Sequence, residues 1–371
     1  MSEWKKYKLG DAIKFGNGKV RPNSIGKIPV YGGNGILNFC DEANYENETI
    51  IIGRVGAYCG AVYYENKPIW VSDNALAAKP KEKFNAKFLF YLLKNLELNQ
   101  FAEGSSHPLV TQSLLNSIDV LITDDESEQR AIASVLSSLD DKIELLHRQN
   151  KTLEAMAETL FRQWFMEDAD ERWEEGCLGD IADINPSYQL KKGAISTYLE
   201  MSNVSTSTFI PEGWYKREFS SGMKFQNGDT LLARITPCLE NGKTCFVTFL
   251  EEDEIGWGST EYIVIRMKNP FHPYISHVIA NDKDFRDFAI SSMSGSSGRQ
   301  RAQANVIKEY DIKVPPLEII EELNLQLAGI LSKLENNANQ IRTLEKLRDT
   351  LLPKLMSGEV RCSWRVQKDE N

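Results

Sequence analysis

The sequence has no long apolar segment. No run of about 18 apolar residues occurs in it, and Met1–Lys6 lacks the apolar core of a secretory signal. Its six cysteines form no Cys-x-x-Cys pair, and its four histidines show no spacing typical of metal ligands. We therefore expect a cytoplasmic protein with reduced thiols, no metal site and no membrane partner.

Basic side chains are also outnumbered, and the formal net charge is −10. The acidic excess is concentrated in residues 126–171, which carry 5 basic and 11 acidic side chains. A nucleic-acid partner would therefore require local basic patches elsewhere on the chain, or help from a basic protein. The net charge neither supports nor excludes such a partner.

A repeat organises the chain. The triplet Lys142-Ile143-Glu144 returns as Lys333-Leu334-Glu335, and Thr152-Leu153-Glu154 returns as Thr343-Leu344-Glu345. Both triplets are displaced by 191 positions (333 − 142 and 343 − 152). Each copy lies in a long heptad pattern that follows a globular segment. The sequence therefore predicts two globular heads, each followed by a long helix, with an internal pseudo-twofold repeat.

Each heptad run has ten seam positions, spaced alternately by four and three. The first run consists of Ile132, Leu136, Leu139, Ile143, Leu146, Asn150, Leu153, Ala157, Leu160 and Trp164. The second consists of Leu323, Leu327, Ile330, Leu334, Asn337, Ile341, Leu344, Arg348, Leu351 and Leu355. Such spacing favours a coiled-coil seam; the alternative is two amphipathic helices packed separately on the heads.

The polar seam residues indicate the register. If the helices are antiparallel and Asn150 faces Asn337, all ten layers of each run find a partner. Two facing amides can form a hydrogen bond, whereas a parallel pairing would place Asn150 against Ile341. We therefore predict an antiparallel coiled coil whose register is set by Asn150 and Asn337.

Each head mixes short strands with helices. Leu9-Gly10-Asp11 recurs as Leu178-Gly179-Asp180. Segments 48–56 and 229–236 are predicted strands that run into turns containing an arginine. Helices are expected at 85–98 and 273–290, small polar loops at 104–108 and 295–301, and final short strands at 118–122 and 311–314. The predicted fold class is α/β, with a twisted sheet in each head.

This alternation of two variable heads with two long helices resembles the specificity subunits of type I restriction–modification systems. The phrases that carry the resemblance are Ile28–Ile36, Gly53–Gly56, Trp70–Ala75, Glu128–Ala133 and Leu351–Val360. Three departures stand out. Thr123 occupies the place of a usual proline, the second long helix lacks the Glu-Gln phrase, and the second head lacks Tyr-Gly-Gly-Asn-Gly. The last departure implies that the two heads prefer different DNA sequences.

The resemblance implies a domain plan and a set of partners. Target-recognition domains would span 1–125 and 167–316, long helices 126–166 and 317–357, and a C-terminal tail 358–371. Each head would read one half of an asymmetric bipartite site in double-stranded DNA. The helices would set the spacing and dock two copies of a methyltransferase subunit, and a restriction (translocase) subunit would complete the complex. The chain would be non-catalytic and bind no cofactor, with S-adenosylmethionine, ATP and Mg²⁺ on partner subunits.

Candidate DNA contacts are the residues that suit bases or phosphates. Arginine can grip guanine with two hydrogen bonds, asparagine and glutamine can grip adenine, and small polar loops approach phosphates. In the first head they are Lys19, Tyr31, Asn34, Arg54, Tyr58 and His107. In the second they are Arg234, Thr236, Asn241, Lys243, Ser296, Arg299, Gln300 and Arg301.

Two other functions remain open at this point. The phrase Asn185-Pro186-Ser187-Tyr188 approximates the loop with which amino-methyltransferases hold a flipped base. The second proline is missing and no glycine-rich loop follows a strand, so a turn is the alternative to a catalytic loop. A self-sufficient methyltransferase and a coiled-coil adaptor with two ligand-binding heads are the competing hypotheses.

Overall fold

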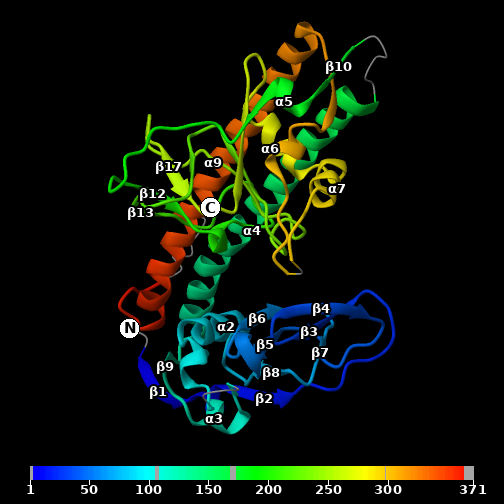
Figure 1. Ribbon diagram of the computed structural model, residues 1–371. Coiled ribbons are helices and arrows are strands. Elements are labelled where there is room, and N and C mark those ends of the chain that lie inside the picture. Colours follow the sequence, from blue (N-terminus) through cyan, green and yellow to red (C-terminus); the bar gives the residue numbers. More distant parts are fainter. Residues whose placement is uncertain (1–2, 105–107, 168–172, 297, 363–371) are drawn as a thin grey trace, which may run out of the picture. The chain divides into compact units, whose positions relative to one another are not determined.

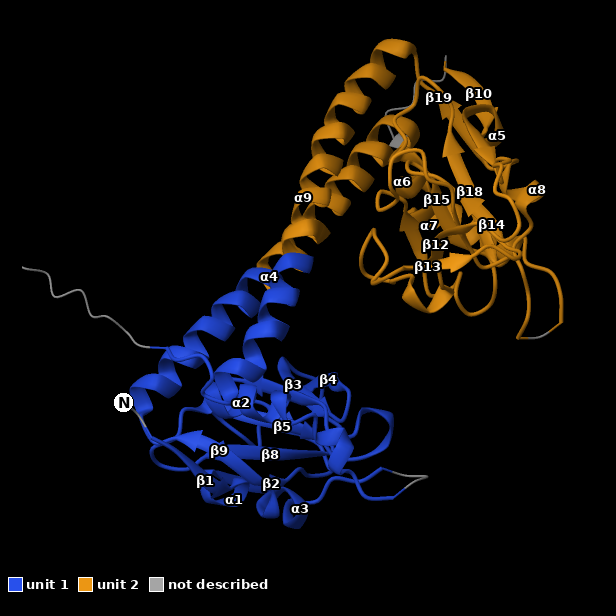
Figure 2. Cartoon of the chain, turned by 90° about the vertical axis from the view of Figure 1, so that its left-hand side faces the viewer, with its two compact units in different colours: residues 1–143, 342–371 blue, residues 144–341 orange. Residues whose placement is uncertain are grey.

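A computed structural model describes residues 3–104, 108–167, 173–296 and 298–362 of the chain (Figure 1). The chain forms two compact units, coloured separately in Figure 2. Unit 1 comprises Met1–Ile143 with Arg342–Asn371, and unit 2 comprises Glu144–Ile341. The long helices α4 (Glu126–Arg162) and α9 (Leu317–Met356) are therefore each divided between the two units.

The main sheet of unit 1 is antiparallel, with strand order β2-β8-β5-β6. Its strands are Ile13–Asn17 (β2), Ala75–Pro80 (β8), Thr49–Gly53 (β5) and Val62–Glu65 (β6). The central strand β5 is buried on both faces. Ile50 and Ile52 pack with helix α2 (Ala86–Asn95), while Ile51 packs against a second, smaller sheet. A continuous β-branched run suits such a position, because every side chain needs an apolar partner.

The smaller sheet of unit 1 has the order β4-β3-β7, and β3 pairs with β7 in parallel. Its strands are Ile28–Gly32 (β3), Gly35–Cys40 (β4) and Trp70–Val71 (β7). The remaining elements of unit 1 are Trp4–Lys8 (β1), Leu9–Ala12 (α1), Gly56–Tyr58 (η1), Leu98–Phe101 (η2), Gln112–Ser117 (α3) and Asp119–Thr123 (β9). Strands β1 and β9 pair with each other and close the unit before α4 begins.

Unit 2 repeats this plan. Its main sheet has the order β11-β18-β15-β16, with strands Ala182–Ile184, Tyr262–Met267, Thr230–Ala233 and Thr244–Phe246. Its smaller sheet has the order β13-β12-β17-β14, with strands Tyr215–Glu218, Ile195–Leu199, Gly256–Gly258 and Met223–Phe225. The other elements are Gln163–Glu167 (η3), Glu174–Cys177 (β10), Leu178–Ile181 (α5), Met201–Asn203 (η4), Ile275–Asn281 (α6), Lys283–Ser291 (α7), Ala304–Ile307 (α8) and Asp311–Val314 (β19). The α/β fold class and the internal repeat are confirmed.

The repeated Leu-Gly-Asp phrase begins a one-turn helix in both units. The Leu9 N–H donates to the Ile118 carbonyl and the Leu178 N–H to the Tyr310 carbonyl, both at 2.8 Å. Asp11 and Asp180 accept the main-chain N–H three residues earlier, at 3.1 and 2.8 Å. The repeat is therefore structural, because each aspartate satisfies a helix-start N–H that would otherwise lack a partner.

The phrase Glu128–Ala133 near the start of α4 fastens the first part of this helix to the rest of unit 1. The buried Gln129 accepts the Asn85 N–H at 2.8 Å and donates to the Thr123 carbonyl at 2.9 Å. Asn85 in turn caps α2 by accepting the Phe88 N–H at 3.0 Å. In unit 2, which lacks the phrase, Asn324 of α9 replaces it and accepts the His272 N–H at 2.8 Å.

Asp282 interrupts the helix predicted at 273–290. Two helices, α6 and α7, occupy this segment. The Asp282 carboxylate accepts the N–H groups of Asp284 and Phe285 at 2.8 and 3.2 Å, and it also accepts a hydrogen bond from Arg162 at 2.6 Å. The predicted helical stretch is therefore present as two helices, because an N-cap with a tertiary partner restarts the helix inside the apolar pattern.

In unit 2, α4 and α9 lie side by side (Figure 2). Leu153 and Leu160 of α4 pack in one apolar cluster with Leu327 and Leu334 of α9, as an antiparallel register requires. The Asn337 Nδ2 donates to the Asn150 Oδ1 at 2.8 Å, and both side chains are buried. The two amides therefore meet across the seam in the register that the heptad runs indicate.

In unit 1, the polar seam position Arg348 is matched by an acid. Its Nη1 lies 2.9 Å from the Asp140 Oδ1 on α4. Tyr91 of α2 donates to the other oxygen of the same carboxylate at 2.8 Å. Apolar layers continue beyond this pair, where Ile132 and Leu355 lie in the same buried cluster. The charge of Arg348 is thus balanced by Asp140, so that an arginine can occupy this position of the heptad run.

Candidate nucleic-acid interface

Arg54 and Arg234 occupy equivalent positions in the two units. Each follows the central strand of its main sheet, β5 or β15. The Arg54 N–H donates to the Asn74 carbonyl at 3.0 Å, and the Arg234 N–H to the Glu261 carbonyl at 2.9 Å. Their own carbonyls accept the N–H groups of Val110 (3.0 Å) and Ala302 (2.8 Å). The same backbone clamp therefore holds an arginine at the same end of both sheets.

The backbone clamps join two loops in each unit. In unit 1, residues 54–61 meet residues 108–110 through a bridge between Val55 and Leu109. In unit 2, residues 234–243 meet residues 294–302 through a bridge between Ile235 and Arg301. We call these loop pairs the unit 1 rim and the unit 2 rim. Each rim brings together loops that lie far apart in the sequence.

The two rim arginines share an electrostatic feature. Among the described residues, the Nε atoms of Arg54 and Arg234 are buried and have no hydrogen-bond partner. A buried donor on a permanent charge is costly when it stays unpaired. Both side chains are partly exposed, so an acceptor-rich, anionic ligand at the rim can bond the rest of each guanidinium, and a DNA duplex offers both phosphates and base edges.

The other unit 1 candidates lie in different environments. Asn34 is exposed in the turn between β3 and β4, Tyr58 in η1 is 53% exposed, and Lys19 is exposed. Tyr31 is 7% exposed and lies in the core between the two sheets, where its hydroxyl is 3.4 Å from Glu65. Tyr31 therefore acts as a packing residue in this structure, and His107 lies outside the described residues.

Two unit 2 candidates are occupied by partners within the unit. The Lys243 Nζ donates to the Met201 carbonyl at 2.8 Å, which ties the rim to η4. The Arg301 guanidinium donates to both oxygens of Glu261 at 2.8 to 3.0 Å. Both cations therefore help to build the rim. The charge of Arg301 is matched by Glu261, and Lys243 donates to a main-chain carbonyl.

The remaining unit 2 candidates form the accessible part of the rim. Asn241 is exposed, and Thr236 lies beside it in the first rim loop, with its N–H donating to the Gln300 carbonyl at 3.1 Å. Exposed positions of the second rim loop are Ser296, Arg299 and Gln300. Gly295 and Gly298 have φ values of +128° and +77°, which L side chains rarely adopt, so both glycines are needed for the shape of this loop.

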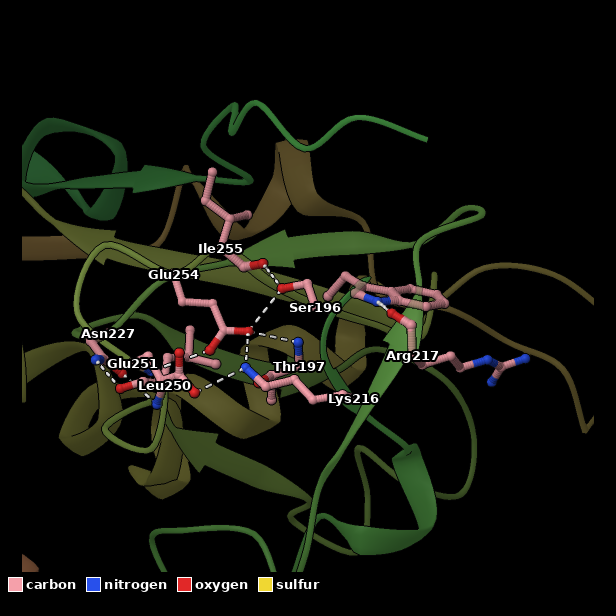
Figure 3. A network of polar contacts seen from close by, with 10 residues as sticks. Ser196, Thr197, Lys216, Arg217, Asn227, Leu250, Glu251, Glu254 and Ile255 are labelled. Atoms are coloured by element: carbon pink, nitrogen blue, oxygen red, sulfur yellow. Dashed lines mark hydrogen bonds and ion pairs between the residues drawn. The ribbon is translucent and has the colours of Figure 1, made fainter. Parts of the chain in front are cut away.

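Sequence reasoning missed a polar network on the smaller sheet of unit 2, shown in Figure 3. The Glu254 carboxylate accepts the Ser196 hydroxyl at 2.9 Å, the Thr197 N–H at 2.8 Å and the Lys216 ammonium at 2.9 Å. Burial acts to raise the pKa of Glu254, but the hydrogen bonds from Lys216, Thr197 and Ser196 outweigh it and lower the pKa to about 2. The network locks β12 to β13. No local sequence pattern marks it, because its members are up to 58 positions apart.

The segment that approximated a methyltransferase loop has a structural role. Asn185 accepts the Val264 N–H at 2.9 Å and so ends the pairing of β11 with β18. The Tyr188 hydroxyl donates to the fully buried Asp229 carboxylate at 2.8 Å. Both side chains are therefore engaged in holding the sheet rather than directed toward a substrate.

The described histidines take part in no metal-like arrangement. Over the described ranges, no group of three or more His, Cys, Asp or Glu side chains is arranged to hold a metal ion. His277 is buried in α6, and burial lowers its pKa to about 3. The helices among the described residues are also too short or too polar to cross a membrane.

Comparisons with known proteins agree on one family. The sequence model described as "Type I restriction modification DNA specificity domain" matches residues 1–155 and 170–348. The MjaIX type I restriction enzyme specificity subunit of Methanocaldococcus jannaschii is 25% identical over 337 residues, covering 81% of this chain and 75% of its own. The HindI specificity subunit of Haemophilus influenzae is 22% identical, covering 97% and 100%. The S subunit of the M. genitalium type I restriction–modification system has a similar fold, with a TM-score of 0.63 at 18% identity, covering 96% of each chain.

Proposed function

This chain belongs to the type I restriction modification DNA specificity family, and we propose that it reads a bipartite DNA site, one half with each unit. The observation that carries the proposal is the pair of equivalent rims. Both units hold a partly exposed arginine directly after the central strand, in the same backbone clamp, and its Nε has no hydrogen-bond partner among the described residues. The framework is the same, but the exposed side chains around the two arginines differ. Two recognition units that share a backbone framework but differ in their exposed side chains suit a DNA site whose two halves differ in sequence.

The rims offer the contacts that base reading needs. Arg54 and Arg234 can each bond guanine O6 and N7, and Asn241 of the unit 2 rim can bond an adenine edge. In unit 1, the exposed Asn34 in the turn between β3 and β4 can do the same. The glycines of the second rim loop allow the main chain to approach a phosphate. With a net charge of −10, the chain gains little attraction to DNA from its overall charge. We therefore assign part of the DNA affinity to a basic surface on a partner subunit.

The long helices suit a spacer. Helix α4 has 37 residues and α9 has 40, which correspond to roughly 55 and 60 Å at 1.5 Å per residue. We propose that they set the distance between half-sites and dock two copies of the methyltransferase subunit. A restriction subunit would join this complex. S-adenosylmethionine, ATP and Mg²⁺ would bind to those partners, and this chain would contribute recognition alone.

Separate substitutions of the two rim arginines test whether each unit reads its own half-site. Arg54→Ala and Arg234→Ala would each be assembled with the methyltransferase subunit, and methylation would be mapped over a library of sites. Each variant should relax base preference in one half-site only, by about 1–3 kcal/mol at one position. Lys67→Ala, at the opposite end of β6 from the unit 1 rim, and Lys283→Ala on α7 are matched controls for loss of a surface cation. Loss of preference in both half-sites from either arginine variant would contradict the proposal.

A further inference from the structure

Arg217 lies in a cluster of aromatic rings on the smaller sheet of unit 2. Its guanidinium carbon is 4.7 Å from the Tyr198 ring centroid and 5.6 Å from that of Trp257. The Tyr198 ring in turn lies 5.4 Å from Tyr215 and 4.4 Å from Trp257. We call these four residues the aromatic–arginine cluster. The cation–π contact with Tyr198 restrains the guanidinium, which keeps a planar fork of donors.

The strand that carries Arg217 is held rigidly. The Trp257 Nε1 donates to the Arg217 carbonyl at 3.4 Å, and the Glu254 network locks β13 to β12 (Figure 3). In that view the Arg217 side chain extends away from the network. A rigid strand lowers the entropy that Arg217 would lose on binding.

The two neighbouring cations of β13, Lys216 and Arg217, differ in whether an acidic side chain neutralises them. Lys216 forms ion pairs with Glu254 and Glu251 at 2.9 and 3.4 Å. Arg217 has no ion-pair partner among the residues that the structure describes, although all four residues of β13 are exposed. β13 is also an edge strand, since the sheet order is β13-β12-β17-β14. Arg217 is therefore an accessible, oriented and uncompensated charge.

The cluster adjoins the unit 2 rim. The Tyr215 hydroxyl donates to Glu200, the residue that follows β12, at 3.2 Å. Met201, one residue further, accepts a hydrogen bond from the rim residue Lys243 at 2.8 Å. A duplex that lies on the unit 2 rim would therefore have the cluster close to its path.

Unit 1 has the same framework without the arginine. The parallel pairs Val30–Trp70 and Tyr198–Trp257 are equivalent, so the antiparallel partner of Ile28, Cys40, corresponds to Arg217. Cys40 is fully buried. The fold thus does not require an arginine at this position. A residue that differs between two equivalent frameworks is suited to determine what each of them reads.

We propose that Arg217 is a specificity-determining residue that reads a guanine in the half-site of unit 2. The inference rests on the proposed function and adds a base contact outside the rim. A guanidinium restrained over an aromatic ring presents its planar fork in a limited range of orientations, which favours bidentate bonds to O6 and N7 of guanine over the less directional contact with a phosphate. Tyr198 and Trp257 are positioning residues, since they act through the orientation of Arg217.

The test uses the complete complex with its methyltransferase subunit. Arg217→Ala and Arg217→Lys are compared with the unaltered chain on the preferred duplex and on duplexes changed at one base pair at a time. We expect cognate affinity to fall roughly 10- to 100-fold for Arg217→Ala. Discrimination should be lost at one G·C pair of the unit 2 half-site, with the other half-site unchanged. Arg217→Lys should not restore discrimination, because an ammonium lacks the planar fork.

Control variants separate positioning from folding. Tyr198→Leu removes the stacking ring and should weaken discrimination at the same base pair, while Lys283→Ala should change nothing. A uniform loss for all duplexes that Arg217→Lys repairs would assign Arg217 to a phosphate and overturn the proposal, as would unchanged binding by Arg217→Ala. If the unaltered complex itself showed no sequence preference, the proposed function would fail; if it did and the Arg217 variants kept every preference, only this inference would fail.

Discussion

The pair of buried asparagines offers the sharpest test of the coiled coil. Asn337 is fully buried and Asn150 is 8% exposed, and a single hydrogen bond of 2.8 Å joins them. The Asn337 Oδ1 has no hydrogen-bond partner among the described residues. Asn150→Leu would remove the only partner of the Asn337 Nδ2 found in that set. The seam would then contain an amide with both ends unsatisfied in an apolar layer.

The expected cost follows from that geometry. Losing the bond and leaving a buried amide unpaired should lower the free energy of unfolding by about 1–3 kcal/mol. Asn337→Leu should cost less, because the amide left behind, Asn150, is nearer to water. Changing both residues to leucine should restore or exceed the original stability, since no unpaired amide remains. The structure therefore predicts the order double variant, then Asn337→Leu, then Asn150→Leu, from most to least stable.

Urea unfolding followed by far-UV circular dichroism measures these differences. Asn336→Leu is the matched control, since it makes the same change one residue away at an exposed position, and it should stay within about 0.5 kcal/mol of the parent. A double variant less stable than both single variants would show that the two amides do not face each other.

Two further predictions concern a partly buried acid, Glu154, and a rim-facing acid, Glu261, of unit 2. Burial raises the pKa of Glu154 from 4.5 to about 7, partly offset by the Phe209 N–H. A raised folded-state pKa stabilises the protein below pH 4.5, and this contribution is lost as the pH rises through 7. Glu154→Gln should therefore gain up to about 3 kcal/mol relative to the parent between pH 5 and pH 8, whereas the exposed Glu158→Gln should not, as urea unfolding at both pH values would show. Glu261→Gln should weaken the ion pair with Arg301 and remove a negative charge from the rim. Non-specific DNA affinity and its salt dependence should both rise, as titrations at several salt concentrations would show. A fall in affinity would show that this ion pair is needed to shape the rim.

Periodic features of this chain could be predicted from the sequence. The heptad runs and the register of Asn150 against Asn337 depend on spacing alone, because a 3.5-residue repeat fixes which side chains share a seam. The arginines after β5 and β15 were also identifiable, since a β-branched run ending at a turn is a local signal. The correspondence of the two arginine-containing segments followed from the repeat, whereas the backbone clamps around Arg54 and Arg234 did not.

Features that depend on distant partners could not be predicted. The burial of Tyr31 depends on a second sheet packing over β5, and the occupation of Arg301 depends on Glu261, which lies 40 positions away. Arg217 gave no signal, because the two aromatic rings that it contacts, Tyr198 and Trp257, lie on two other strands. In unit 2, Asn324 takes the place of the missing Glu-Gln phrase by accepting the N–H of His272, which lies 52 positions away. Residue type suggested chemistry in each case, but the tertiary partner decided the role.

Shortening both long helices by one heptad tests the central claim most directly. Deleting 141–147 and 340–346 preserves the seam and keeps Asn150 opposite Asn337, while the helical pair becomes roughly 10 Å shorter. At roughly 3.4 Å per base pair this is about 3 base pairs, or about a third of a helical turn, so overall binding should weaken. Methylation mapping with the partner subunit should show both half-sequences unchanged and the gap between them shortened by about 3 base pairs. Methylation only at sites with the original gap would show that the helices do not set the spacing.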